Sequence, residues 1–316
     1  MSMTPPVLGP NGWLVEPIEA EEPVPAVLGS SGLWWDFKTD FGKAQLADRS
    51  ALLTFANSIG TPLTLSSSQP YVAFNNSGAL QTNVALMSAL QKAIFNLATI
   101  TTEEMFVMWA ILTHGTTAGS QTGTLFFWGR SNNSGGGNGW GLQAYGGAST
   151  LKLRMYHTPQ GGSNDQTNVP ASFQLVGDTT DNTKTAFAMT LTRSCVGSDQ
   201  GNMGRGAGLF RVAVAMAGLV KEGQFGQVNS HCFDIARIPS GTGPANYCDT
   251  GLTIGARPTT AAGTVSDLLP ANWGLDTIGF QRRKRREGLA QKIVRQLAEQ
   301  YRTAPTVIIQ PPVVAN

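Results

Sequence analysis

Apolar and polar residues alternate with a period of two along most of this chain, in short runs separated by Gly, Pro, Ser and Asn. This pattern predicts strands joined by turns. In Leu151–His157 every other residue is apolar, which predicts a strand with one buried face. Glu104–Leu112 and Thr124–Trp128 are almost continuously apolar and predict strands buried on both faces. Trp140–Ala144 is predicted to form a hairpin with Leu151–His157, after a Gly-rich loop at Ser131–Gly139.

Further short runs of the same kind extend the prediction to roughly a dozen strands. They are Leu33–Phe37, Leu52–Ala56, Leu63–Leu65, Tyr71–Phe74, Ser172–Leu175, Lys184–Arg193, Gly208–Met216, His231–Ile238, Leu252–Pro258 and Thr277–Arg282. Many short strands with turns between them are typical of a β-sandwich.

Two segments carry a helical period instead. Val84–Leu97 places Leu86, Leu90 and Ile94 on one face. The segment 287–302 has a full apolar stripe, which includes Leu289, Ile293 and Leu297. A lone amphipathic helix must bury its stripe elsewhere, so we expect it to cover a sheet edge or an end of the sandwich. The predicted fold class is all-β, with one C-terminal helix and a single domain over residues 30–302.

Composition agrees with this fold class. Only 13% of the 316 residues are charged, 41% are hydrophobic and 37 are Gly, which suits a sizeable core and many turns. A net charge of +2 is too small to favour nucleic acid as a partner. No basic–apolar–small segment begins the chain, and no apolar run approaches the ~20 residues of a membrane span. We therefore expect no secretory signal and no membrane partner.

Both ends of the chain predict extended arms. Residues 1–29 are rich in Pro and acidic, with no basic residue before Lys38, and such a segment resists helix and central strand. Residues 303–316 are uncharged, and Pro flanks a β-branched stretch there, which suits docking as an edge strand. A frayed terminus is the alternative. The candidate partner-binding residues of the arms are Trp13, Glu16, Glu19, Glu21, Glu22, Val307, Ile308 and Ile309.

Several motifs resemble those of one fold family when taken in order. They are Trp34–Phe37 followed by Leu46–Ser50, Tyr71–Phe74, Phe106–Trp109, Thr124–Gly129 with Gly139–Gln143, Leu252–Gly255, and Ile278–Phe280 followed by a short helix ending in Leu297 and Tyr301. Over residues 33–302 this order resembles the concanavalin A-like (laminin-G-like) jelly-roll family. That family includes glycan binders, adhesion modules, glycosidases and structural modules of virus particles, so the fold alone does not fix the function.

The low charge, the polar loops and the extended ends are similar to those of bacteriophage virion proteins that carry such a jelly roll. This resemblance implies a non-enzymatic structural protein of a phage particle: a capsid decoration, fibre or tail-associated component. Its partners would be other copies of itself and other virion proteins, bound through the arms. It would be made in the host cytoplasm and located in the virion.

Catalytic and metal sites find little support in the sequence. Glycosidases on this fold need two carboxylates across the scissile bond, but Glu103 and Glu104 are adjacent and would face opposite ways in a strand. His231 and Cys232 are likewise neighbours, and three Cys show no pairing motif. Short polar stretches around Asp165 and Asp181 are more simply turns than calcium ligands. We therefore expect no enzyme activity and no cofactor.

The basic run Arg282, Arg283, Lys284, Arg285 and Arg286 is the sharpest charge feature. It is predicted to lie in the loop before the C-terminal helix, where cations oppose the helix dipole. Three interpretations remain open: a solvated cluster, a clasp for an acidic protein surface such as the chain's own Glu16–Glu22, or a grip on nucleic acid.

A glycan site needs an exposed aromatic ring beside amides or hydroxyls. The best candidates are Trp140, Tyr145, Tyr156 and Asn138, close to the loop at 131–139. They support an alternative function as a glycan-binding adhesin or host receptor-binding module. Glycan binding should survive deletion of the arms, whereas assembly should not.

Overall fold

The structure, a computed structural model, describes the two sheets and the helices that pack on them. The described residues are 7–8, 14–15, 32–36, 53–57, 72–74, 78–82, 84–114, 121–130, 138–146, 152–158, 165–168, 183–193, 209–218, 229–234, 251–259, 265–270 and 273–303.

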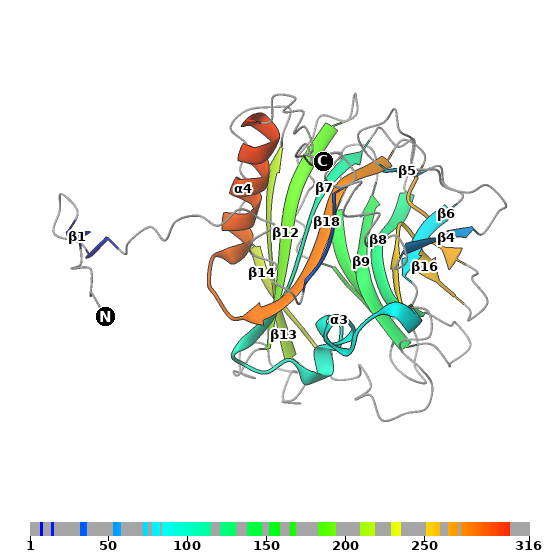
Figure 1. The fold of residues 1–316 in the computed structure, drawn as a ribbon, viewed down its shortest axis with the longest axis horizontal. Helices are drawn as coiled ribbons and strands as arrows, with labels where there is room; N and C mark the ends of the chain where they lie inside the picture. Colours follow the sequence, from blue (N-terminus) through cyan, green and yellow to red (C-terminus); the bar gives the residue numbers. More distant parts are fainter. Residues whose placement is uncertain are drawn as a thin grey trace, which may run out of the picture.

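Two antiparallel sheets make up the body (Figure 1). Sheet I has seven strands in the order β11 (Asp165–Asn168), β10 (Lys152–Thr158), β9 (Asn138–Gly146), β8 (Gln121–Arg130), β15 (Leu252–Ile254), β6 (Gly78–Thr82) and β4 (Leu53–Asn57). Sheet II has the order β14 (Asn229–Asp234), β13 (Leu209–Gly218), β12 (Thr183–Arg193), β7 (Glu104–His114), β18 (Trp273–Lys284) and β3 (Leu33–Asp36), with β5 (Val72–Phe74) also pairing β18. The predicted all-β sandwich with one C-terminal helix is confirmed.

The core lies between the sheets, where alternate residues of each strand face inward. In β7 the inward set of Phe106, Met108, Ala110 and Leu112 belongs to this core, together with Phe126 and Phe280. The other set of β7, which includes Val107 and Trp109, is equally buried but belongs to a second cluster. The prediction that this strand is buried on both faces is therefore confirmed.

Helix α4 (Leu289–Thr303) covers the second face of β7. Its apolar stripe packs with Trp109 and with four alanines, Ala186, Ala188, Ala215 and Ala217, on the outer face of β12 and β13. Figure 1 shows α4 lying along this side of sheet II. Small side chains let the helix approach the sheet closely, and the helix buries what would be an exposed apolar face. The expectation of a sheet edge or sandwich end was wrong, because α4 covers a face.

The helix predicted at Val84–Leu97 is broken into three short pieces: η3 (Val84–Leu86), α3 (Ala89–Ile94) and η4 (Leu97–Thr99). Ser88 starts α3 with a capping box, since its hydroxyl accepts from Gln91 N–H and the Gln91 amide accepts from Ser88 N–H. The predicted apolar face is also wrong, because Leu90 is 66% exposed and Leu86 is exposed too. Ile94 of the predicted face is buried as expected, and it joins the core between the sheets together with Met87, Phe95, Leu97 and Ile100.

Most other predicted strands match strands of the structure, including the hairpin of β9 and β10. The last two residues of the loop predicted at 131–139, Asn138 and Gly139, belong to β9. Tyr156 on β10 is buried as well as the core-facing Leu153 and Met155, so that strand is covered on both faces. The segments Leu46–Ser50, Leu63–Leu65 and Ser172–Leu175 lie outside the described residues.

Two further hairpins complete the described structure. β1 (Val7–Leu8) pairs only with β2 (Leu14–Val15) in a sheet of their own. β16 (Arg257–Pro258) pairs β17 (Val265–Ser266) beside β8 and β15. Within the described part of the chain, no helix is long and apolar enough to cross a membrane.

Candidate functional site

The basic run is mostly strand, not loop. The last three residues of β18 are Arg282, Arg283 and Lys284. Of the basic run, only Arg285 and Arg286 lie in the connection between β18 and α4. The correction has a structural cause: β18 pairs β7 as far as Lys284, which lies opposite Glu104. Successive side chains of a strand point to opposite faces, so the run does not present its charges on one surface.

Arg282 is held inside the protein. Its Nε and Nη2 donate to the two carboxylate oxygens of Glu104 at 3.1 and 2.6 Å. Its other donors reach the Ala93 carbonyl at 3.3 Å and the hydroxyl and carbonyl of Thr99 at 2.8 and 2.5 Å. A guanidinium has five N–H donors, and these five bonds use them all. Arg282 therefore ties α3 and η4 to the end of sheet II and has no donor left for a partner.

The Glu104 carboxylate is fixed in its ionised form by the same contacts. The hydrogen bond from Arg282 holds the pKa of Glu104 below its ordinary value of about 4.5, against the opposing effect of burial. Hydrogen bonds from the N–H and hydroxyl of Thr101 lower the pKa further. A carboxylate in this state is a poor general acid near neutral pH.

Arg285 forms a more open ion pair at the start of α4. Its Nε and Nη2 both donate to one oxygen of Glu287, at 3.1 and 2.8 Å. The Glu287 side chain is 80% exposed, so this pair is of the weak, exchangeable kind. Lys284 and Arg286 are also exposed. The part of the basic run that can meet a partner is therefore its second half.

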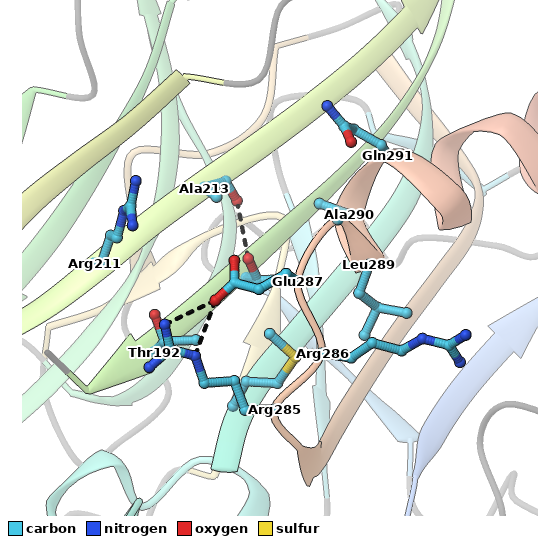
Figure 2. Close-up of a pocket in the computed structure, with 12 residues that line it drawn as sticks. Thr192, Arg211, Ala213, Arg285, Arg286, Glu287, Leu289, Ala290 and Gln291 are labelled. Atoms are coloured by element: carbon cyan, nitrogen blue, oxygen red, sulfur yellow. Dashed lines mark hydrogen bonds and ion pairs between the residues drawn. The ribbon is translucent and has the colours of Figure 1, made fainter. Parts of the chain in front are cut away.

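A polar pocket lies at the amino end of α4, on the outer face of sheet II (Figure 2). Its volume is about 170 Å³. The polar and charged residues that line it are Thr190 and Thr192 from β12, Arg211 from β13, and Arg285, Arg286, Glu287 and Gln291 from the helix start. Figure 2 shows Arg211 on one side of the opening and the first turn of α4 on the other.

Two of the four candidate glycan-binding residues are in the interior. Trp140 is 2% exposed, its indole N–H donates to the Phe95 carbonyl at 3.0 Å, and its ring lies edge-on to Phe106. Tyr156 is also 2% exposed and has Arg257 over its ring. The prediction of an exposed aromatic platform is wrong for both rings. Asn138 and Tyr145 lie on β9, but their side chains are outside the described set.

Tyr156 lies beside a glycine on the outer face of sheet I. Gly141 on β9, between β10 and β8, is opposite both Tyr156 and Phe127. A Cβ at Gly141 would overlap the Phe126 carbonyl oxygen and Phe127. The rings of Phe127 and Tyr156 lie with their centroids 6.0 Å apart.

The next row of sheet I carries a polar cluster that the sequence did not reveal, defined here as Thr124, Gln143, Arg154, Arg257 and Asp267. Arg154 Nε donates to the Gln143 amide oxygen at 2.9 Å, and Gln143 Nε2 donates to Thr124 at 3.2 Å and to Asp267 at 3.0 Å. Asp267 also accepts from Arg257 Nε at 2.7 Å.

The cluster is built on an unusual backbone. Asp267 has φ of 48°, in the left-handed region that Asp tolerates better than most residues. Its carbonyl accepts from Thr124 N–H at 2.8 Å, which fixes the turn after β17 over sheet I. Only Arg154 and Asp267 reach the surface in part, since Gln143 and Thr124 are fully buried. The cluster can therefore present one guanidinium and one carboxylate to solvent.

The acidic side chains of these arrangements are paired with arginines. Glu104, Asp267 and Glu287 are each ion-paired to an arginine. Among the described residues, no group of three or more His, Cys, Asp and Glu side chains is placed to hold a metal ion. The arm residues Trp13, Glu16, Glu19, Glu21, Glu22, Val307, Ile308 and Ile309 lie outside the described residues.

Comparison with known proteins gives only distant likenesses. No family model matches the chain, and no curated protein matches it. The CBM40 domain of the Ruminococcus gnavus IT-sialidase, bound to α2,6-sialyllactose, aligns at 11% identity and TM-score 0.39, over 77% of this chain and 98% of that one. Tailspike protein 2 of an Escherichia coli O157:H7 bacteriophage aligns at 14% identity and TM-score 0.38, over 77% of this chain and 27% of that one.

A mutant NanB sialidase from Streptococcus pneumoniae aligns at 16% identity and TM-score 0.39, over 71% of this chain and 27% of that one. Likenesses at this level carry no argument about function. The description of the fold therefore rests on the strand order and on the packing of α4.

Proposed function

We propose that this chain is a non-enzymatic structural protein of a bacteriophage particle, a capsid decoration, fibre or tail-associated component, that assembles through its terminal segments. The sandwich is the rigid body, and residues 1–29 and 303–316 are the connectors. Partners are other copies of the chain and other virion proteins. We further propose that the sandwich belongs to the concanavalin A-like jelly-roll type.

One observation carries the proposal: the two described strands of the N-terminal segment form a sheet of their own. Among the described residues, β1 and β2 pair with each other and not with a strand of sheet I or sheet II. In Figure 1 this hairpin stands apart from the sandwich. Such a segment gains its stability from a partner, and ordering it there allows a large contact at a cost in chain entropy.

The sandwich itself supports the role of a rigid body. Both faces of β7 are buried, one by sheet I and the other by α4. Three carboxylates, Glu104, Asp267 and Glu287, are ion-paired to arginines, and the pKa of Glu104 is lowered by its hydrogen bond from Arg282. A body of this kind serves recognition and assembly better than catalysis.

The test is self-association of the full chain and of two single deletions, one lacking residues 1–29 and one lacking 303–316. Sedimentation velocity should show an assembly for the full chain that at least one deletion abolishes. Far-UV circular dichroism of each deletion is the control for folding. A full chain that stays monomeric at all concentrations and binds no other virion protein would contradict the proposal.

Glycan binding remains the second candidate, and the observation that favours it is the polar cluster on sheet I. Arg154 and Asp267 are the parts of that cluster at the surface, beside the strand that carries Asn138 and Tyr145. A glycan array run on the full chain and on residues 30–302 separates the candidates, because glycan binding should survive removal of both ends. Release of reducing sugar in the same assay would overturn the non-enzymatic assignment.

A further inference from the structure

We propose that the pocket at the amino end of α4 binds an oxyanion, the carboxylate, sulfate or phosphate group of a ligand. The site goes beyond the proposed assembly role and is separate from the polar cluster on sheet I. It is formed where the alanine-lined contact between α4 and sheet II gives way to polar residues.

The outer faces of β12 and β13 explain why the pocket is there. On β12 the outward residues run Ala186, Ala188, Thr190 and Thr192, and across the ladder Thr192 lies opposite Arg211 on β13. The helix packs on the alanines. The helix begins at Leu289, so it does not reach the end of the sheet beyond Thr190. Residues 285–288, which precede the helix, lie there instead, and a cavity of about 170 Å³ remains between them and the sheet.

The charges around the cavity favour an anion. Arg211, Arg285 and Arg286 line it, and Glu287 is the one acidic residue among the lining residues. Glu287 is engaged by Arg285, but it is largely exposed, so a ligand anion can replace it on the guanidinium. A planar guanidinium matches the two oxygens of a carboxylate or phosphate.

The helix start adds neutral donors. The first N–H groups of a helix have no partner within the helix, and they carry the positive end of its dipole. Gly288, Leu289, Ala290 and Gln291 all line the cavity. Gly288 has φ of 70° and no side chain to cap the helix, and the first turn has no acidic residue. An anion from outside the helix can therefore accept hydrogen bonds from the first N–H groups of α4 and cap the helix.

Thr192 is the independent observation that points to a ligand. It is only 9% exposed, yet within the described part of the chain its hydroxyl has no hydrogen-bond partner. Its Oγ1 is not among the fully enclosed polar atoms, and the residue lines the cavity, so the hydroxyl can be reached from the pocket. A ligand oxygen can therefore accept a hydrogen bond from it in place of water.

The size of the cavity suits the proposed ligand. A volume of about 170 Å³ is well above what a single water needs, so there is room for an oxyanion and for part of the molecule that carries it.

Calorimetric titration of the full chain with sodium sulfate, sodium phosphate and sodium acetate, in a constant chloride background, tests the proposal. At least one anion should bind saturably. Thr192→Val keeps the shape and removes the hydroxyl, and should weaken binding about tenfold, while Thr192→Ser should restore it. Glu287→Gln removes the competing carboxylate and should tighten binding several-fold.

Arg295→Gln is the matched control, because it removes an exposed positive charge from α4 outside the pocket lining and should leave the affinity unchanged. Absence of saturable binding by all three anions would overturn the proposal. So would equal affinities of the wild type and Thr192→Val, with both proteins shown to be folded by their melting curves.

A last variant identifies the source of the anion. Replacing Glu16, Glu19, Glu21 and Glu22 by Gln in the full chain removes the acidic groups of the N-terminal segment. Tighter binding of the free anion by this variant would assign the pocket to the chain's own carboxylates. Unchanged binding would assign it to an anionic group on another molecule. Because the readout is anion affinity and not mass, it is independent of the assembly test.

Discussion

Gly279 on β18 lies directly opposite Trp109 on β7, on the face of sheet II that α4 covers. A Cβ at position 279 would overlap three atoms of the Trp109 ring, Cζ2, Cε2 and Cη2. Cζ2 and Cη2 lie in the six-membered ring of the indole, which extends beyond the reach of a Phe side chain, and Cε2 is an atom shared by the two rings. Gly279→Ala should therefore destabilise the wild-type protein and be tolerated when Trp109→Phe is also present.

The magnitude of the single change follows from two opposing effects. Overpacking a close-packed site costs about 1–3 kcal/mol, and replacing Gly by Ala in a strand returns about 0.5–1 kcal/mol, so the single Gly279→Ala change should cost about 1–2 kcal/mol. Trp109→Phe leaves a small cavity but also removes a buried indole N–H that has no partner among the described residues. We expect a coupling energy of about 1–2 kcal/mol between the two sites.

Urea denaturation followed by far-UV circular dichroism measures all four members of the cycle without relying on Trp fluorescence. The free energies are comparable if the m-values agree. If the double variant costs the sum of the two single variants within about 0.5 kcal/mol, the two residues do not compete for the same space. The described packing of the Trp109 ring against Gly279 would then be wrong.

Three further predictions concern the polar contacts. Arg282→Gln should cost about 2–3 kcal/mol of unfolding free energy, because the bonds of Arg282 to Glu104 and to two backbone carbonyls are lost. Arg285→Gln should cost under about 1 kcal/mol, because it breaks only an exposed ion pair. Equal costs of the two variants in urea denaturation would contradict this prediction. The pKa of Glu104 is lowered in the folded state, so its ionised form stabilises the protein above a pH of about 4.5, and this stabilisation is lost as the pH falls through the lower folded pKa. The loss of unfolding free energy on the acid side should therefore be smaller in Arg282→Gln than in the wild type. Identical pH profiles of the two proteins would refute the assignment. Asp267→Ala should lower the free energy of unfolding by about 2–3 kcal/mol, because it removes the partner of Arg257 and a residue that tolerates positive φ. Thermal unfolding measures this effect. A melting temperature equal to that of the wild type would contradict the described cluster.

Strands and the long helix could be predicted because each carries its own period. The apolar run of β7 showed burial on both faces, and the stripe of α4 showed that it must cover something apolar. What it covers was also present in the sequence, since Ala186, Ala188, Ala215 and Ala217 alternate on neighbouring strands. The alternation of alanines can be interpreted as a surface for a helix only when the pairing of β12 and β13 is known.

The candidate site residues could not be predicted equally well, because burial is set by neighbours distant in sequence. Trp140 is buried by Phe95, Phe106 and Phe126, which come from three other elements. The five donors of Arg282 find acceptors that are 178 to 189 residues away in the sequence. A local run of basic residues gives no sign of either arrangement, and so the run was expected in a loop with its charges free.

The measurement that tests the central claim most directly is the solution mass of the full chain and of residues 30–302, by light scattering after gel filtration. The account predicts a full chain well above its 33.4 kDa monomer mass and a trimmed body that is folded and monomeric. Two folded monomers would contradict assembly of the chain with itself through its ends. A trimmed body that still assembles would place the contact on the sandwich and contradict the account as well.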